Sequence, residues 1–187
     1  MGSGKGTNCY SLLDAFASGL LNTTEIIGVF SDNQNSGILD IAKGAKIPGL
    51  YLGPYDRLNA EKDKSWIDEI KNLNPDLIVL AGFMRVLSKQ FIEAFDSRII
   101  NLHPSLLPCF RGLNAVKQAW DAGVKITGCT VHWVSPDLDC GEIIAQAPVR
   151  IMTSDTLESV TAKVQAAEHM LLPSVVAEIS QGMKPCE

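Results

Sequence analysis

The first half of the chain alternates stretches of helical hydrophobic spacing with short apolar runs. Apolar residues about three or four positions apart predict helices from Asn8 to about Gly19, from Gly37 to Lys46 and from about Glu61 to Leu73. Asn74-Pro75 ends the third helix, because proline cannot continue one. The run from Ile26 to Phe30 lies between the first two helices and is typical of a short buried strand.

Two runs in the middle of the chain carry apolar residues on both faces. Leu77 to Ala81 and Ile99 to Leu102 are therefore predicted as central strands of a parallel sheet that helices cover on both sides. Beyond them, alternating residues favour strands that include antiparallel pairing, and Pro173 should shift or kink the last helix. The predicted bounds are 114–122 for a helix, 127–134 and 142–151 for strands, and 156 to about 180 for the last helix.

Strands and helices in alternation favour an α/β fold with a doubly wound, mostly parallel sheet. Sheets of this kind bind ligands at the carboxyl ends of their strands. The topology places Ala81 to Arg85 and Asn101 to Pro104 side by side at one edge, each directly after a strand. We therefore expect the functional site at this edge.

Composition limits the class of protein. A length of 187 residues suits one domain, and we expect residues 1–187 to form it. The net charge of −5 argues against a protein that coats nucleic acid, but a local pocket can still bind a small anion. No apolar run approaches the roughly 20 residues that span a bilayer, and the chain opens without a leader pattern. We therefore expect a cytoplasmic protein without a membrane partner.

Cysteine and histidine spacing favours no metal site. The 5 cysteines include no C-x-x-C pair and are expected as free thiols in a reducing compartment. The 3 histidines, His103, His132 and His169, lack paired-ligand spacing, so we expect no metal. A cysteine nucleophile is disfavoured for Cys109 and Cys140, since neither has an evident basic neighbour or helix N-terminus.

A glycine-rich segment, Gly2 to Asn8, runs directly into the first predicted helix. Glycines let backbone N–H groups converge, and a helix N-terminus adds positive partial charge, so the segment is suited to hold a phosphate. The letters Gly-Ser-Gly-Lys-Gly-Thr also fit the phosphate loop of a nucleotide kinase, with Lys5 on the outer phosphates. That loop requires a further upstream glycine and a preceding strand, and the segment has neither.

Asn101 and His103 lie two positions apart at a strand end and so point to the same side. An Asn N–H can donate to a carbonyl oxygen, and a protonated His can stabilise the oxyanion formed when that carbonyl is attacked. An Asp from the turn at 136–142 that folds back onto His103 would orient the imidazole and favour its protonated form. Glu168 could accept from two sugar hydroxyls. A structural His103, a solvated turn and an exposed Glu168 stay open as alternatives.

These segments together resemble the folate-dependent formyltransferases, and most closely the members that formylate glycinamide ribonucleotide. The resemblance covers nearly the whole chain and implies that the family's catalytic Asn, His and Asp are Asn101, His103 and Asp139. Each segment alone is a modest signal, but all of them in order are highly specific. The segments are Gly2 to Asn8, Leu80 to Ser88, Asn101 to Pro108, Thr127 to Val134, Asp137 to Gly141 and Ala167 to His169.

The resemblance also implies the co-substrate, 10-formyltetrahydrofolate, with no metal, and small-molecule partners for a monomer or homodimer. For the ribonucleotide, it implies that the phosphate lies on Gly6, Thr7 and Asn8, the sugar and amide on Gly82, Met84 and Pro104, and the ribose hydroxyls on Glu168. For the folate, it implies contacts with Arg85, Val86, Leu87 and Asn101, and with Val134, Ser135 and Asp137 around the pterin.

The chain departs from the family pattern in two places. Asn59 aligns where many relatives have an Arg near the ribose phosphate, and Arg57 is a nearby substitute. Relatives also begin with an apolar strand before the glycine loop, and this first strand is missing here, since only Met1 precedes the glycines. We therefore expect that the natural reading frame supplies about five more apolar residues upstream.

Related enzymes remain as alternatives. Methionyl-tRNA formyltransferases share the Leu-Leu-Pro loop and the following Arg111-Gly112, but carry a basic C-terminal domain for tRNA. Formyltetrahydrofolate hydrolases use similar residues and carry an additional N-terminal regulatory domain. A nucleotide kinase and a non-catalytic folate- or nucleotide-binding module are less favoured, because Asn101, His103 and Asp139 are all present.

Overall fold

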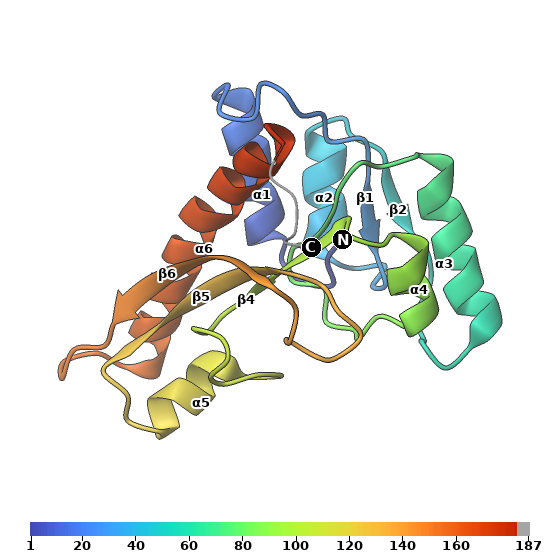
Figure 1. Cartoon of the computed structure of the whole chain (residues 1–187). Coiled ribbons are helices and arrows are strands. Elements are labelled where there is room, and N and C mark those ends of the chain that lie inside the picture. Colours follow the sequence, from blue (N-terminus) through green and yellow to red (C-terminus); the bar gives the residue numbers. More distant parts are fainter. Residues whose placement is uncertain (183–187) are drawn as a thin grey trace.

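The computed structural model describes residues 1–182, which form six helices and six strands (Figure 1). The helices are α1 (Thr7–Ala17), α2 (Gly37–Gly44), α3 (Ala60–Asn72), α4 (Lys89–Ala94), α5 (Ala115–Asp121) and α6 (Leu157–Ser180). The strands are β1 (Val29–Ser31), β2 (Gly49–Tyr51), β3 (Ile78–Leu80), β4 (Ile99–His103), β5 (Ile126–Trp133) and β6 (Ile143–Arg150). Each helix and strand predicted above corresponds to one of these elements.

The sequence pattern does not predict β2 or α4. β2 has 3 exposed residues and α4 has 6 residues, so neither gives a periodic signal long enough to recognise. The strand expected at 26–30 begins too early. β1 starts at Val29 because its pairing with β2 starts there, with Val29 opposite Gly49.

The strands form two sheets in the described residues. β1 and β2 pair in parallel, as do β3 and β4. β5 and β6 extend the second sheet with antiparallel pairing, in the region where alternating residues predict it. The predicted α/β class is therefore confirmed, with parallel strands in the first part of the chain and an antiparallel extension in the second.

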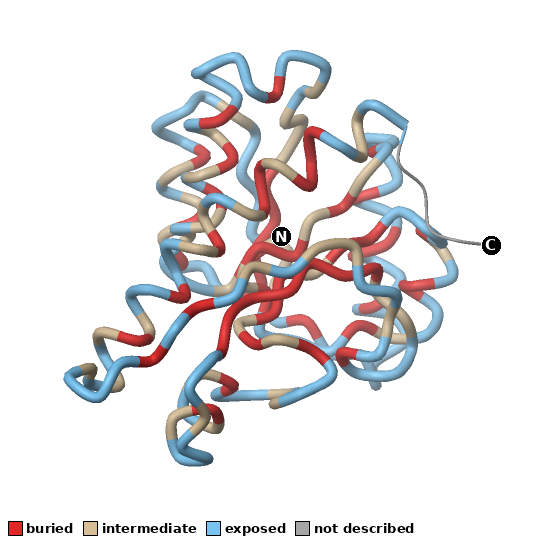
Figure 2. Tube along the Cα trace, turned by 60° about the vertical axis from the view of Figure 1, so that its left-hand side comes forward, coloured by how far each residue is buried: buried red, intermediate tan, exposed pale blue. Residues whose placement is uncertain are grey.

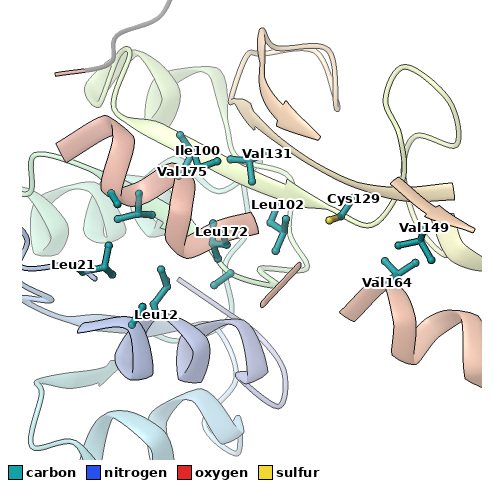
Figure 3. Close-up of a cluster of buried hydrophobic side chains, with 14 of the residues drawn as sticks. Leu12, Leu21, Ile100, Leu102, Cys129, Val131, Val149, Val164, Leu172 and Val175 are labelled. Atoms are coloured by element: carbon teal, nitrogen blue, oxygen red, sulfur yellow. The ribbon is translucent and has the colours of Figure 1, made fainter. Parts of the chain in front are cut away.

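Helices cover both faces of the parallel strands, as a doubly wound sheet requires. Successive residues of β4 enter different cores: Ile99 packs with Trp66 and Phe91 on the side of α3 and α4, while Ile100 packs with Leu172 of α6 on the other. Figure 3 shows the second core, between α1, α6 and strands β4 to β6. Figure 2 shows that the buried residues concentrate along the strands.

Residues 1–3 lie between the two sheets, so the chain begins next to buried strands (Figure 2). The Met1 ammonium donates to the Val79 carbonyl of β3, and the Gly2 N–H donates to the Phe30 carbonyl of β1. Burial lowers the pKa of the Met1 ammonium to about 6. A mainly apolar cavity of about 670 Å³ lies beside these residues between β1 and β3. The expected upstream strand stays a prediction.

α6 is the longest element and carries Glu168 on its buried side. It begins with a capping box, in which the Thr156 side chain accepts from the Ser159 N–H and the Ser159 side chain accepts from the Thr156 N–H. The helix continues past Pro173 to Ser180. This long packed helix fixes the position of Glu168 relative to α1.

We expect Gly128→Ala to destabilise the protein, because β5 and β6 approach closely at this position. An alanine Cβ at Gly128 would lie 2.1 Å from the Ala147 carbonyl oxygen, so the two strands would have to separate. Such overpacking costs about 1–3 kcal/mol, and each kcal/mol lowers the melting temperature by about 2–4 °C in a chain of this size.

Gly44→Ala is the matched control. A Cβ there has no atom within 4 Å and sits at the end of α2, where alanine is favoured over glycine by about 0.5–1 kcal/mol. Thermal melting followed by circular dichroism compares the two variants. If Gly128→Ala has the same melting temperature as the wild type, the close packing of β5 and β6 at this position is contradicted.

Candidate active site

A cavity of about 670 Å³ opens at the carboxyl ends of β3 and β4, the edge that the sequence predicts. Leu80 and Asn101 are paired across these two strands, so the segments that follow them lie next to each other. Every predicted site residue lines this cavity: Gly6, Thr7, Asn8, Gly82, Met84, Arg85, Val86, Leu87, Asn101, His103, Pro104, Val134, Ser135, Asp137, Asp139 and Glu168.

The glycine loop is held in place by α2. Gly6 has a φ of 81°, and a Cβ there would lie 2.8 Å from the Ile38 Cα, so the position requires glycine. The Ile38 N–H donates to the Gly4 carbonyl at 3.3 Å. Within the described residues, none of the backbone N–H groups from Gly4 to Asn8 donates a hydrogen bond to the protein. The loop therefore presents free N–H groups at the N-terminus of α1, which suits an anion.

Glu168 reaches the same end of the cavity from α6. Asn8 Nδ2 donates to Glu168 Oε2 at 3.2 Å, while the buried Asn8 Oδ1 has no partner among residues 1–182. Burial raises the pKa of Glu168, and the Asn8 hydrogen bond offsets this only in part. A buried carboxylate with one donor has unused acceptor capacity, which suits it to hydroxyl groups of a ligand.

His103 and Asp139 meet in a second cluster that lines the cavity. His103 Nδ1 lies 3.5 Å from Asp139 Oδ2, and His103 Nε2 lies 2.9 Å from the Phe110 carbonyl oxygen. The Gly112 N–H donates to Asp139 Oδ2 at 2.8 Å, which fixes the carboxylate. Both ring nitrogens of His103 thus face oxygen acceptors, an arrangement that an imidazolium satisfies at both sides. The expected return of the 136–142 turn onto His103 is found.

His132 is a buried residue of this site that the sequence interpretation did not assign. Its Nε2 lies 3.1 Å from Asn101 Nδ2 and 3.8 Å from Asp139 Oδ1. Burial lowers the pKa of His132, opposed by the Trp133 carbonyl and Asp139. His132 lies within residues 127–134, one of the segments that resemble the formyltransferases. Only the pairing of β5 with β4 places it opposite Asn101.

Apart from its histidines, the cavity has two basic side chains. Lys5 and Arg85 are the lysine and arginine residues that line it in the part of the chain that the structure describes. The Arg85 Nε lies 2.6 Å from Oδ2 of the buried Asp32, whereas Lys5 has no ion pair among these residues. Asn59 caps α3 by accepting from the Lys62 N–H, and neither Asn59 nor Arg57 lines the cavity.

Residues 1–182 contain no group of three or more His, Cys, Asp or Glu side chains placed to bind a metal ion. No helix among them has both the length and the apolar composition needed to cross a membrane. Cys9, Cys109, Cys129 and Cys140 are free thiols, and Cys186 lies outside the described residues.

The fold and the site define a Rossmann-like α/β domain with a ligand-sized cleft at its strand ends. The sequence profile of the formyl transferase family matches residues 1–176, so the chain belongs to the formyl transferase family.

Named relatives and solved structures agree with this assignment. Phosphoribosylglycinamide formyltransferase of Haemophilus influenzae is 38% identical over 96% of this chain and 85% of that protein. The trifunctional purine biosynthetic protein adenosine-3 of Bos taurus is 38% identical over 96% of this chain, which spans 18% of that longer protein.

Glycinamide ribonucleotide transformylase 1 of Symbiobacterium toebii has a TM-score of 0.94 at 35% identity, covering 100% of this chain and 88% of that one. The structure of phosphoribosylglycinamide formyltransferase from Anaplasma phagocytophilum has a TM-score of 0.87 at 40% identity. The match covers 96% of this chain and 84% of that one.

We expect Glu168→Gln to stabilise the protein near neutral pH. A raised pKa means that the folded state binds the Glu168 proton more tightly than the unfolded state does, so stability falls as the pH rises above about 4.5 toward the folded-state pKa. Glutamine has no proton to lose and can still accept from Asn8. The variant should melt higher at pH 7.5, by about 2–4 °C for each kcal/mol of relief.

The measurement is thermal melting of both proteins between pH 4 and pH 8. Glu178→Gln, an exposed carboxyl on the same helix, is the control and should leave the profile unchanged. If the melting temperatures of the wild type and Glu168→Gln change in parallel with pH, the raised pKa of Glu168 is contradicted.

Proposed function

We propose that the protein transfers the formyl group of 10-formyltetrahydrofolate to the glycyl amine of glycinamide ribonucleotide. The observation that carries the proposal is that one cavity holds two sets of groups. One is a glycine loop suited to a phosphate, and the other is the cluster of Asn101, His103 and Asp139. Family membership and the named relatives support the same activity.

At the ribonucleotide end, the phosphate would accept from the free N–H groups of Gly6, Thr7 and Asn8. Glu168 would accept from the ribose hydroxyls, and Lys5 would balance the phosphate charge. Further along the cavity, Gly82, Met84 and Pro104 would contact the sugar and the amide. This placement brings the glycyl amine toward His103.

At the folate end, the co-substrate would lie between two segments that border the cavity. Arg85, Val86 and Leu87 follow β3, while Val134, Ser135 and Asp137 follow β5. Asn101 on β4 lies in the same cluster as His103, so it can contact the formyl oxygen. This arrangement would hold amine and formyl carbon next to each other, which removes much of the entropic barrier to their reaction.

The chemistry requires no covalent link to the enzyme. The amine nitrogen forms a bond to the formyl carbon, and the carbonyl electrons move onto oxygen, where an N–H of Asn101 and the positive charge of protonated His103 would stabilise the oxyanion. The bond to the folate N10 then breaks as the carbonyl reforms. The amine loses one proton and N10 gains one, relayed near His103 and Asp139, so the enzyme is unchanged after each turnover.

We further infer that residues 1–187 act as one formyltransferase domain in the cytoplasm. The proposed substrates are small molecules, and the protein would work as a monomer or homodimer without nucleic-acid or membrane partners. The acidic net charge of −5 argues against a nucleic-acid partner.

The deciding experiment offers the purified protein 10-formyltetrahydrofolate alone, with glycinamide ribonucleotide, or with methionyl-tRNA, and separately ATP with AMP. We expect tetrahydrofolate and the formylated ribonucleotide from the second mixture only. Release of formate without an acceptor would identify a hydrolase, formylated tRNA would identify the tRNA enzyme, and ADP would identify a kinase. Each of these results would replace the proposal.

We expect His103→Ala to lower kcat by about 10²–10³-fold, the scale of losing one group that stabilises the oxyanion, with little change in either KM. The residue would act on charge that exists only in the transition state. Steady-state kinetics with both substrates make the measurement. Cys140→Ser is the control and should keep wild-type turnover, because the mechanism uses no thiol. A His103→Ala protein with raised KM and normal kcat would contradict the assigned role.

We expect Lys5→Gln to raise the KM for the ribonucleotide by roughly 1.5–5-fold, the scale of an exposed ionic contact. The KM for 10-formyltetrahydrofolate should stay unchanged, because Lys5 lies at the phosphate end. Arg57→Gln serves as the comparison, since Arg57 does not line the cavity. If Arg57→Gln raises this KM and Lys5→Gln does not, Arg57 supplies the charge instead.

A further inference from the structure

His132 lies directly opposite Asn101 in the antiparallel pairing of β4 with β5. Side chains at opposed positions share one face of the sheet and are close enough to touch. His132 is only 2% exposed, so its ring contacts are those of the protein interior. The mechanism above gives this residue no task, although it touches one of the groups assigned to the oxyanion.

The contacts of the His132 ring determine which nitrogen carries the proton. Nδ1 lies 2.8 Å from the Trp133 carbonyl oxygen, which can only accept, so Nδ1 must be protonated. In the neutral ring Nε2 then has a lone pair. The Asn101 Nδ2 is 3.1 Å from Nε2 and can only donate, so the hydrogen bond runs from Asn101 to His132.

This bond also determines how the Asn101 amide is turned. Either end of an Asn amide fits the same shape, and only hydrogen-bond partners distinguish the nitrogen from the oxygen. Because an unprotonated His132 Nε2 can only accept, the Asn101 amide must turn its nitrogen toward it. One N–H of Asn101 is then used, and the second N–H remains for the cavity, which Asn101 lines.

Burial favours a neutral His132, against the opposing effect of the nearby Asp139 carboxylate. Asp139 faces both rings: its Oδ2 lies 3.5 Å from His103 Nδ1, and its Oδ1 lies 3.8 Å from His132 Nε2. Two imidazolium rings beside one carboxylate would repel each other, which also disfavours a charged His132. His103 has oxygen acceptors near both nitrogens, whereas the Asn101 amide nitrogen faces His132 Nε2.

We propose that His132 is a positioning residue: its bare Nε2 accepts one N–H of Asn101 and thereby turns the amide so that the second N–H can donate to the oxyanion. The inference rests on the proposed function, because it takes the catalytic use of Asn101 from there. His132 itself touches no reacting atom in this scheme.

Two amide substitutions separate the contacts of the ring. Asparagine places an amide nitrogen where His132 has Nδ1, so His132→Asn keeps a donor for Trp133 but loses the acceptor for Asn101. Glutamine reaches as far as Nε2, so His132→Gln keeps an acceptor for Asn101. We expect kcat to fall about 10-fold or more in His132→Asn and less than about 5-fold in His132→Gln, with both KM values unchanged. Equal losses in the two variants would overturn the proposal.

A double-mutant cycle tests whether His132 acts through Asn101. Once Asn101→Ala has removed the amide, adding His132→Asn should change kcat by less than about 2-fold, because coupled residues are non-additive. Losses that multiply would show that His132 acts independently, and would contradict the proposal. Thermal melting of each variant identifies any that fails to fold.

Nitrogen-15 NMR of the histidine rings gives a readout that needs neither activity nor a His132 variant. In the wild-type protein at pH 7.5, His132 should show a protonated Nδ1 and a bare, hydrogen-bonded Nε2, and in Asn101→Ala the Nε2 signal should shift. A protonated Nε2 would overturn the inference even in an active enzyme. If the wild type formylates no ribonucleotide, the proposed function fails, and the ring spectrum still reports the tautomer separately.

Discussion

β4 carries Asn101 and His103 on one side, and its antiparallel pairing with β5 decides what surrounds them. The pairing sets His132 opposite Asn101 and Thr130 opposite His103. The Thr130 hydroxyl accepts from the Leu107 N–H and donates to the Ser105 carbonyl, which ties down the loop that follows β4. The end of β5 also starts the turn that returns to the cavity. One strand pairing therefore supplies the neighbours of both groups proposed to stabilise the oxyanion.

The turn after β5 brings the charge that completes this cluster. Asp139 has a φ of 51°, in the left-handed region, and Gly141 follows where a Cβ would collide with the Trp133 carbonyl oxygen. The chain can therefore pack tightly enough against β5 for the Asp139 carboxylate to reach His103. Backbone strain of this kind is tolerated where the surrounding contacts hold it, and it commonly accompanies functional sites.

Two buried carboxyl groups that line the cavity, Asp139 and Glu168, differ in how many hydrogen-bond and charge partners they have. Asp139 accepts from the Gly112 N–H and faces His103. Glu168 accepts from one Asn8 N–H, and its pKa is raised by burial. A buried polar group without its full set of partners destabilises the folded state. Glu168 thus has the character of a group whose remaining partners come from a bound ligand, which fits the ribose contact proposed for it.

Local sequence patterns determined most of the elements and which strand ends meet. Apolar runs such as 77–81 and 99–102 identify buried parallel strands because both their faces must be covered. Since parallel strands end at the same edge, the adjacency of Gly82 and Asn101 follows. Asn101, His103 and Asp139 were indicated by the resemblance to the formyltransferases, because the segments that contain them occur in the same order as in that family. β2 and α4 were too short for any periodic signal.

Tertiary structure alone decided the partners that set each side chain's state. Nothing near His132 in the sequence indicates that it opposes Asn101, because the register of β4 against β5 depends on packing between residues some thirty positions apart. The ion pair of Arg85 with Asp32, and the lack of one at Lys5, likewise arise from distant segments. Sequence therefore determined which chemical groups are present and on which elements, while the fold determined their protonation, orientation and charge balance, since these depend on distances that only packing sets.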